Sequence, residues 1–186
     1  MALKATIFKV DLQVADMDRH YYQEHALTIA RHPSETDERM MVRLLAFARH
    51  ADAALAFGKG LSDVAEPDLW QRDLTGAVVL WIEVGQPDEK RILKACGRAT
   101  QVVVLCYGGT SALWWSQVGP KVERARNLTV LALAPPVAQQ LARLAQRTMQ
   151  LQCTIEDGQI WMRTEREAVQ IDLTVLQGST SGSLRK

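Results

Sequence analysis

The segment from Glu66 to Lys94 reads EPDLWQRDLTGAVVLWIEVGQPDEKRILK and has the pattern of a β-hairpin that turns at Thr75-Gly76. In such a hairpin, residues whose numbers add to 151 face each other, so that Asp68 lies opposite Glu83. Directly opposed side chains share one face of the sheet, with Cβ atoms about 5 Å apart. The segment therefore predicts two carboxylates side by side.

The second acid of this pair, Glu83, lies in the apolar run AVVLWIEV at residues 77–84. A nearly unbroken apolar run of this length is typical of a central strand that is covered on both faces, where an acid needs a partner. Two adjacent carboxylates repel each other, and a divalent cation between them relieves the repulsion. Two alternatives stay open: Glu83 pairs with an arginine such as Arg72, and Asp68 is an ordinary carboxylate at the start of a strand.

These residues carry a resemblance to known proteins. Pro67-Asp68, fourteen further residues and then Glu83 resemble the pattern of PD-(D/E)XK nucleases. Three segments are similar to the bacterial YaeQ family: HPSETDERMMVRLLAFARHA, AEPDLW and WIEVGQPDEKRILKA. This similarity covers nearly the whole chain. The resemblance implies an α/β fold with a nuclease-like αβββαβ core, and it does not establish an activity.

The nuclease pattern is incomplete because its lysine, two residues after the glutamate, is replaced by Gly85. The segment Asp88-Glu89-Lys90 matches a D-x-K motif. However, Pro87 suits the first turn of a helix, and side chains two residues apart on a helix point about 200° away from each other, so Asp88 and Lys90 would diverge. We therefore keep Glu83 as the acid and expect Lys90 to supply the ammonium. Lys94, one helical turn further on, is the second candidate. Alternatively, both lysines are solvated.

A third candidate acid is Glu38, in a predicted helix from Ser34 to His50. Ser34 has the position of an N-cap and Asp37 that of the capping-box residue. Glu38 shares a helical face with apolar residues, so its carboxylate is placed to lean toward the acid pair. The alternative is that Glu38 only complements the positive end of the helix dipole.

Two functions are consistent with this set of residues. The first is a phosphodiesterase that acts on nucleic acid and depends on Mg²⁺ or Mn²⁺, in which the ion activates water. The second is a nuclease-like fold kept as a binding or regulatory module, with Gly85 marking lost catalysis. The predicted metal ligands are Asp68, Glu83 and the carbonyl of Val84, the predicted catalytic residues are Asp68, Glu83 and Lys90, and the secondary residues are Glu38, Lys94 and Gln86.

Length and composition limit the class of protein. A chain of 186 residues with 47% apolar content is expected to form one compact domain, residues 1–177, followed by a Ser- and Gly-rich tail, residues 178–186. No apolar stretch approaches 18 residues, and three cysteines without a C-x-x-C spacing indicate reduced thiols, so we expect a cytoplasmic protein that is not in a membrane. The net charge of +1 is low for a nucleic-acid binder, although a local basic patch on residues 90–98 keeps that partner open. A protein partner also stays open, and the oligomeric state is undefined.

The rest of the chain predicts a mixed central sheet together with an N-terminal hairpin and a C-terminal hairpin. The adjacent tryptophans Trp114 and Trp115 are expected on a strand, pointing to opposite faces. Other expected elements are strands at 5–15, 21–31, 101–107 (parallel to the strand of Glu83), 128–133, 150–156, 159–164 and 169–176, and helices at 87–99, 120–125 and 136–146.

Overall fold

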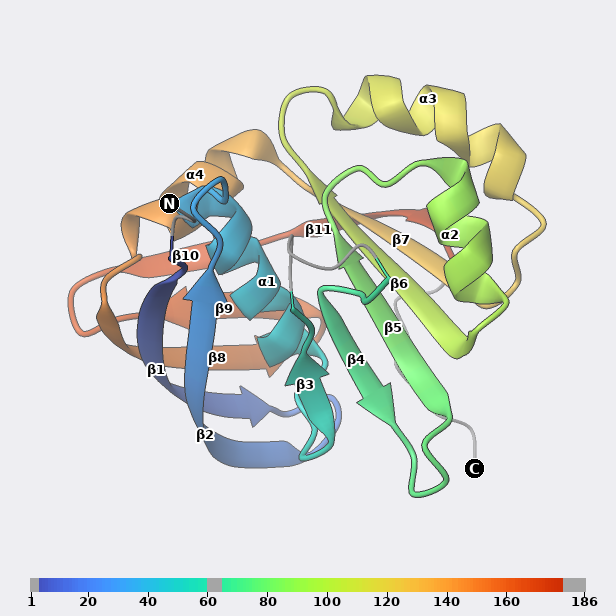
Figure 1. Cartoon of the computed structure of the whole chain (residues 1–186). Helices are drawn as coiled ribbons and strands as arrows, with labels where there is room; N and C mark the ends of the chain where they lie inside the picture. The colour runs from blue at the N-terminus through green and yellow to red at the C-terminus, as the bar shows by residue number, and fades with distance from the viewer. Residues whose placement is uncertain (1–3, 60–64, 179–186) are drawn as a thin grey trace.

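The structure is a computed structural model that describes residues 4–59 and 65–178. Within these residues the chain forms two mixed β-sheets and four α-helices, an α/β architecture without a closed barrel (Figure 1). The elements are β1 (Thr6–Asp16), β2 (Tyr21–Arg31), α1 (Asp37–Arg49), β3 (Leu55–Phe57), β4 (Leu69–Arg72), β5 (Val78–Val84), α2 (Glu89–Cys96), β6 (Ala99–Tyr107), α3 (Ser111–Val122), β7 (Leu128–Leu133), α4 (Pro135–Arg143), β8 (Thr148–Glu156), β9 (Gln159–Arg163), β10 (Ala168–Ile171) and β11 (Leu173–Gln177).

The expected mixed α/β fold with a hairpin at each end is present, but the hairpins form a second sheet that the sequence did not predict. The two terminal hairpins pair with each other through the parallel contact of β1 with β8 and make a separate five-stranded sheet, in the order β10-β9-β8-β1-β2. The other sheet has six strands in the order β11-β7-β6-β5-β4-β3. The strand expected at 169–176 is divided, so that β10 joins the first sheet and β11 the second.

Helix α1 explains why two sheets form, because it lies between them (Figure 1). All nine residues from Met40 to Ala48 are buried, and a helix that is buried all round needs apolar layers on both sides. The helix begins later than the sequence predicted. Its N-cap is Thr36, whose hydroxyl accepts a hydrogen bond from the backbone N–H of Arg39, whereas the hydroxyl of Ser34 bonds to the ring of His32.

The outer face of the six-stranded sheet carries helices α2 and α3 and a second, smaller core. Strands β5 and β6 are parallel, as the sequence predicted, and α2 connects them across this face. Helix α2 begins at Glu89 with Asp88 as N-cap, so Pro87 lies before the helix and not in its first turn. None of the helices in the described residues is long and apolar enough to cross a membrane.

Helix α3 corrects the expectation for the tryptophan pair. Trp114 and Trp115 lie in this helix and not on a strand, and the helix starts at Ser111, well before the predicted start at Pro120. Gly119 makes the helix possible beside Trp115, since a Cβ at this position would lie 2.9 Å from the indole ring. Gly119 and Pro120 hide the helical pattern in the sequence because both residues are poor helix formers.

The β4–β5 hairpin has the predicted register: Trp70 faces Trp81 and Leu69 faces Ile82. At the turn, the carboxylate of Asp73 accepts hydrogen bonds from the backbone N–H groups of Thr75 and Ala77. The register shifts only close to this turn, at Gln71/Arg72. At the far end the regular pairing stops at Leu69 and Ile82, and Asp68 lies just before β4, where its backbone N–H donates to the carbonyl of Ile82 (3.1 Å). The predicted pairing of Asp68 with Glu83 is therefore not part of the register of the hairpin.

Candidate functional site: an acid pair held by arginines

Asp68 is fixed at the start of β4 by both its backbone and its side chain. Its backbone N–H donates to the carbonyl of Ile82 (3.1 Å), and its carbonyl accepts from the N–H of Gly58 (2.9 Å). Its Oδ2 accepts from the backbone N–H of Val84 (2.7 Å), and its Oδ1 accepts from Nη2 of Arg39 (2.7 Å). Asp68 is only 3% exposed, so both oxygens are satisfied without water.

Glu83 is buried on the face of β5 that is covered by α2. Its Oε1 accepts from Nε1 of Trp81 (2.8 Å) and pairs with Nη2 of Arg91 (2.9 Å). Arg91 also donates to the carbonyl of Glu66 (2.9 Å), which holds its guanidinium between β5 and the segment before β4. Burial raises the pKa of Glu83, the bonds from Arg91 and Trp81 act in the opposite direction, and the nearby charge of Asp68 raises it further.

A second buried acid, Glu35, continues the network into α1. Its carboxylate forms a bidentate pair with Arg43, through Nε and Nη2 at 2.7 Å each, and accepts from Nη1 of Arg39 (2.9 Å). Arg39 thus bridges Glu35 and Asp68. Burial acts to lower the pKa of Arg39, but the two carboxylates more than offset this, and its pKa is raised. The result is a chain of alternating charges, Arg43–Glu35–Arg39–Asp68, from the interior to the end of β5.

The oxygens predicted as metal ligands are occupied by N–H donors. Nη2 of Arg39 lies 2.7 Å from Oδ1 of Asp68 and 3.4 Å from the carbonyl oxygen of Val84. The third ligand, Glu83, is held by Arg91. In residues 4–59 and 65–178, no group of three or more His, Cys, Asp or Glu side chains is placed to hold a metal ion. This arrangement does not fit Mg²⁺ or Mn²⁺, which need several free oxygen ligands.

The predicted lysines do not contact the acids. Lys90 and Lys94 are exposed, and neither forms a hydrogen bond or an ion pair with another residue in the described part of the chain. Arg91 reaches Glu83 instead, because the helix begins at Glu89 and turns position 91 toward the sheet. A guanidinium therefore takes the place expected for an ammonium.

Of the secondary residues, Gln86 and Glu38 lie near Tyr107 at the end of β6, whereas Lys94 lies in the last turn of α2. Nε2 of Gln86 donates to the carbonyl of Tyr107 and to the hydroxyl of Thr110, both at 3.0 Å, so this side chain ties two loops together. Glu38 is half-buried, and its charge reaches Tyr107. Burial is the main cause of the raised pKa of Tyr107, with Arg39 lowering and Glu38 raising it. Glu38 thus lies beside the network but does not contact the acid pair.

Several residues of the network were not predicted from the sequence. Glu35, Arg39 and Arg43 have the spacing of consecutive turns on one helix face, which is a signal for ion pairs. Trp81 is two residues before Glu83 on one strand, so that both side chains share a face. Spacing on one helix or strand indicates that such side chains share a face, but it does not indicate which acid each arginine meets.

Glu83→Gln tests the electrostatics of the site. A carboxyl whose pKa is raised on folding stabilises the protein below its unfolded pKa of about 4.3, and this stability is lost as the pH rises through the folded value. We therefore expect the stability of the parent relative to Glu83→Gln to be greatest in acid and to fall toward neutral pH. Urea unfolding at a series of pH values measures this difference.

Glu89→Gln is the matched control, because hydrogen bonds from its own backbone and from Lys121 lower the pKa of Glu89. Its effect on the pH profile should have the opposite sign. A pH profile of Glu83→Gln parallel to that of the parent would show that burial does not disfavour the charge of Glu83.

The fold and site together define a class of protein: an α/β domain of two sheets around a buried helix, with an arginine-paired acid network at the end of its central parallel strands. The family model for "YaeQ protein" matches residues 1–173. The chain belongs to the YaeQ family.

Relatives support this assignment over nearly the whole length. The chain is 48% identical to the YaeQ protein of Salmonella typhi and 45% identical to that of Escherichia coli K12, each over 95% of this chain and 98% of the relative. The crystal structure of YaeQ from Xanthomonas axonopodis pv. citri has a TM-score of 0.91 at 48% identity, covering 94% of this chain and 99% of that one. YaeQ from Pseudomonas syringae has a TM-score of 0.90 at 39% identity, covering 94% and 97%.

Proposed function

We propose that this protein is a nuclease-like module in which arginines replace the metal ion, and that it binds nucleic acid without hydrolysing it. The observation that carries the proposal is the position of Arg39, whose Nη2 contacts both Asp68 and the carbonyl of Val84. These are two of the three oxygens that a catalytic ion would need. A guanidinium supplies the positive charge there, but it carries no water that can be activated for hydrolysis.

The order of elements supports the nuclease likeness. From α1 to β6 the chain runs α1, β3, β4, β5, α2, β6, which is the αβββαβ order of the proposed core. Asp68 and Glu83 also have the positions that the motif requires, at the start of one strand and near the end of the next.

The conformation of Gly85 supports the loss of catalysis. This residue stands where the motif has lysine, and its φ of +110° belongs to a region that residues with side chains rarely adopt. A lysine at this position would need a different backbone path after β5. The absence of the lysine thus goes together with a backbone conformation at the end of β5 that favours glycine. Arg91 and Arg39 neutralise the two acids instead.

The outer layer of helices provides a surface for a polyanion. Residues 88–126 contain seven lysines and arginines against three acids, although the whole chain has a net charge of only +1. On α2 and the turn after it, Lys90, Lys94 and Arg98 are exposed and form no ion pair within the described residues. Phosphate groups are the natural partners of such a face. We place the protein in the cytoplasm, where its three free cysteines would stay reduced.

A second candidate function is the phosphodiesterase that depends on Mg²⁺ or Mn²⁺. One observation favours it: Asp68 and Glu83 are close enough for the charge of one to raise the pKa of the other. Hydrolysis would require Arg39 and Arg91 to release their carboxylates so that an ion can bind, and would need Lys90 to turn toward the site.

One experiment separates the two functions. Fluorescence anisotropy with labelled 20-mer DNA and RNA, with and without Mg²⁺ or Mn²⁺, measures binding, and gels of the same samples measure cleavage. We expect salt-dependent binding that does not require either metal, and no cleavage. Lys94→Ala should weaken binding for all sequences and reduce the salt slope by about 1, since it removes one phosphate contact.

Lys9→Ala, on the opposite sheet, is the control and should bind like the parent. Metal-dependent cleavage that disappears in Asp68→Asn would establish the phosphodiesterase instead. Equal binding by the parent and Lys94→Ala would show that Lys94 on α2 does not contact the nucleic acid.

A further inference from the structure

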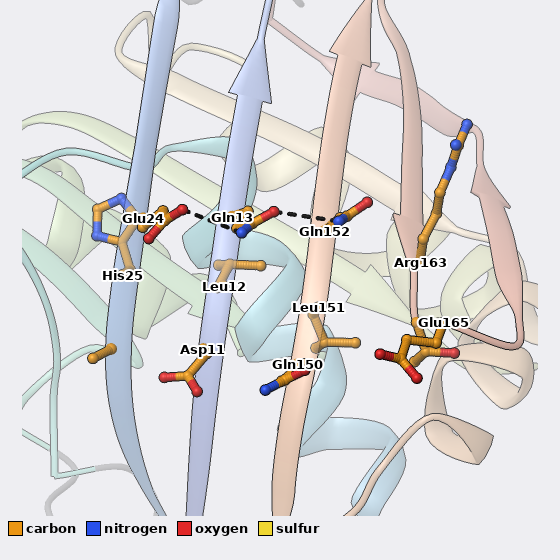
Figure 2. A pocket seen from close by; sticks show the side chains of 12 residues that line it. Asp11, Leu12, Gln13, Glu24, His25, Gln150, Leu151, Gln152, Arg163 and Glu165 are labelled. Atoms are coloured by element: carbon orange, nitrogen blue, oxygen red, sulfur yellow. Dashed lines mark hydrogen bonds between the residues drawn. The ribbon is translucent and has the colours of Figure 1, made fainter.

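The exposed face of the five-stranded sheet contains a pocket of about 560 Å³ (Figure 2). Its polar side chains come from alternate positions of adjacent strands. Asp11 and Gln13 on β1, and Gln150 and Gln152 on β8, point outward, while residues between them point into the core. The pocket therefore lies on the far side of this sheet from α1 and the acid network.

Two glutamines in the pocket are held in a row by side-chain hydrogen bonds. Nε2 of Gln13 donates to Oε1 of Glu24 (3.2 Å), and Nε2 of Gln152 donates to Oε1 of Gln13 (3.3 Å). The register continues the row to Arg163, which faces Gln152. Each amide has two N–H donors and two acceptor lone pairs, so these bonds leave donors and acceptors for a ligand. Strands about 4.8 Å apart set the spacing of the groups.

The charges of the pocket favour a cationic ligand. Asp11, Glu24 and Glu165 line it together with Arg163, and none of the three acids forms an ion pair in the part of the chain that the structure describes. A polyanion such as nucleic acid would meet an excess of negative charge here. An ammonium group would find an unpaired carboxylate.

The next row along the strands adds two aromatic rings. The register places Tyr22, Ala15, Thr154 and Trp161 on four adjacent strands. Tyr22 is 56% exposed and Trp161 is half-buried, and only small side chains lie between them. Rings of this kind offer an apolar face beside polar groups.

We propose that this pocket binds an oligosaccharide of amino sugars. The carboxylates of Asp11 and Glu165 bind its ammonium groups, the amides of Gln13 and Gln152 bind its hydroxyl groups, and the C–H face of one sugar ring packs on Trp161. This inference does not depend on the proposed nucleic-acid function, which uses the opposite side of the molecule.

The test uses three hexasaccharides with the same β-1,4 linkage, which differ only at C2: glucosamine, N-acetylglucosamine and glucose. Isothermal titration calorimetry should show saturable binding of the glucosamine hexamer, with the other two at least about tenfold weaker, because they lack the ammonium group. Asp11→Asn and Gln152→Ala should each weaken binding by about threefold to tenfold, and Trp161→Ala should do the same. The control Glu156→Gln removes an exposed acid that does not line the pocket and should leave affinity unchanged.

Spermine distinguishes a sugar site from simple attraction of cations, since it has the positive charges without the hydroxyl groups and the ring face. It should bind more weakly than the glucosamine hexamer. The proposal is overturned if spermine binds as tightly, if no hexamer shows saturable binding, or if Gln152→Ala and Trp161→Ala bind like the parent.

Discussion

Replacing Glu35 with glutamine is expected to lower the free energy of unfolding by about 3–5 kcal/mol, which is the cost of breaking a buried ion pair. The substitution keeps the shape of the side chain but removes its charge. Arg43, which is 1% exposed, then holds a buried positive charge without a counter-ion, and Arg39 keeps only Asp68. Urea unfolding at neutral pH measures the loss.

Asp37→Asn is the matched control for this substitution. Asp37 is also an acid at the start of α1 and pairs with Arg31, but its side chain is 48% exposed. Removing an exposed ion pair costs about 1 kcal/mol or less. If both variants lose equally little stability, the Glu35 network does not hold the centre of the fold together.

Gly58→Ala is expected to destabilise the protein by about 2–3 kcal/mol and to loosen Asp68. A Cβ at position 58 would lie 2.1 Å from the carbonyl oxygen of Pro67, which is a backbone atom and cannot move aside alone. The backbone bond from Gly58 to Asp68 must therefore shift. Since Asp68 accepts the N–H of Val84, hydrogen exchange at Val84 should accelerate in this variant.

Gly109→Ala provides the comparison, because its Cβ would meet no atom within 4 Å and its backbone φ lies outside the positive region. We expect a change within about 0.5 kcal/mol and unaltered exchange at Val84. Normal stability and normal exchange at Val84 in Gly58→Ala would show that this contact does not position Asp68.

Local sequence patterns predicted the backbone around the two acids. The turn at Asp73 and the alternation of side chains define the register of the β4–β5 hairpin, and both are properties of neighbouring residues. The burial of Glu83 followed from the apolar run around it, and the parallel pairing of β5 with β6 followed from the helix between them. These expectations from the sequence were confirmed.

The residues that pair with the two acids could not be predicted from local sequence patterns. Arg39 is 29 residues from Asp68 in the sequence and reaches it only because α1 lies against the inner face of the six-stranded sheet. The expectation that Lys90 supplies the cation came from the motif, whereas the phase of α2 places Arg91 against Glu83. If the predicted start of a helix is wrong by one residue, the predicted direction of each side chain is wrong by about 100°. The ends of a helix are also the part of it that a sequence defines least exactly.

The sequence alone thus established the strands and helices near the site, the hairpin register and the burial of Glu83, because these depend on short-range periodicity and turns. The tertiary structure decided that the terminal hairpins form a second sheet, that α1 is enclosed between the sheets, and that guanidinium groups hold the acids. These features depend on contacts between distant segments. Local propensity carries no information about which arginine meets which carboxylate once the layers have packed.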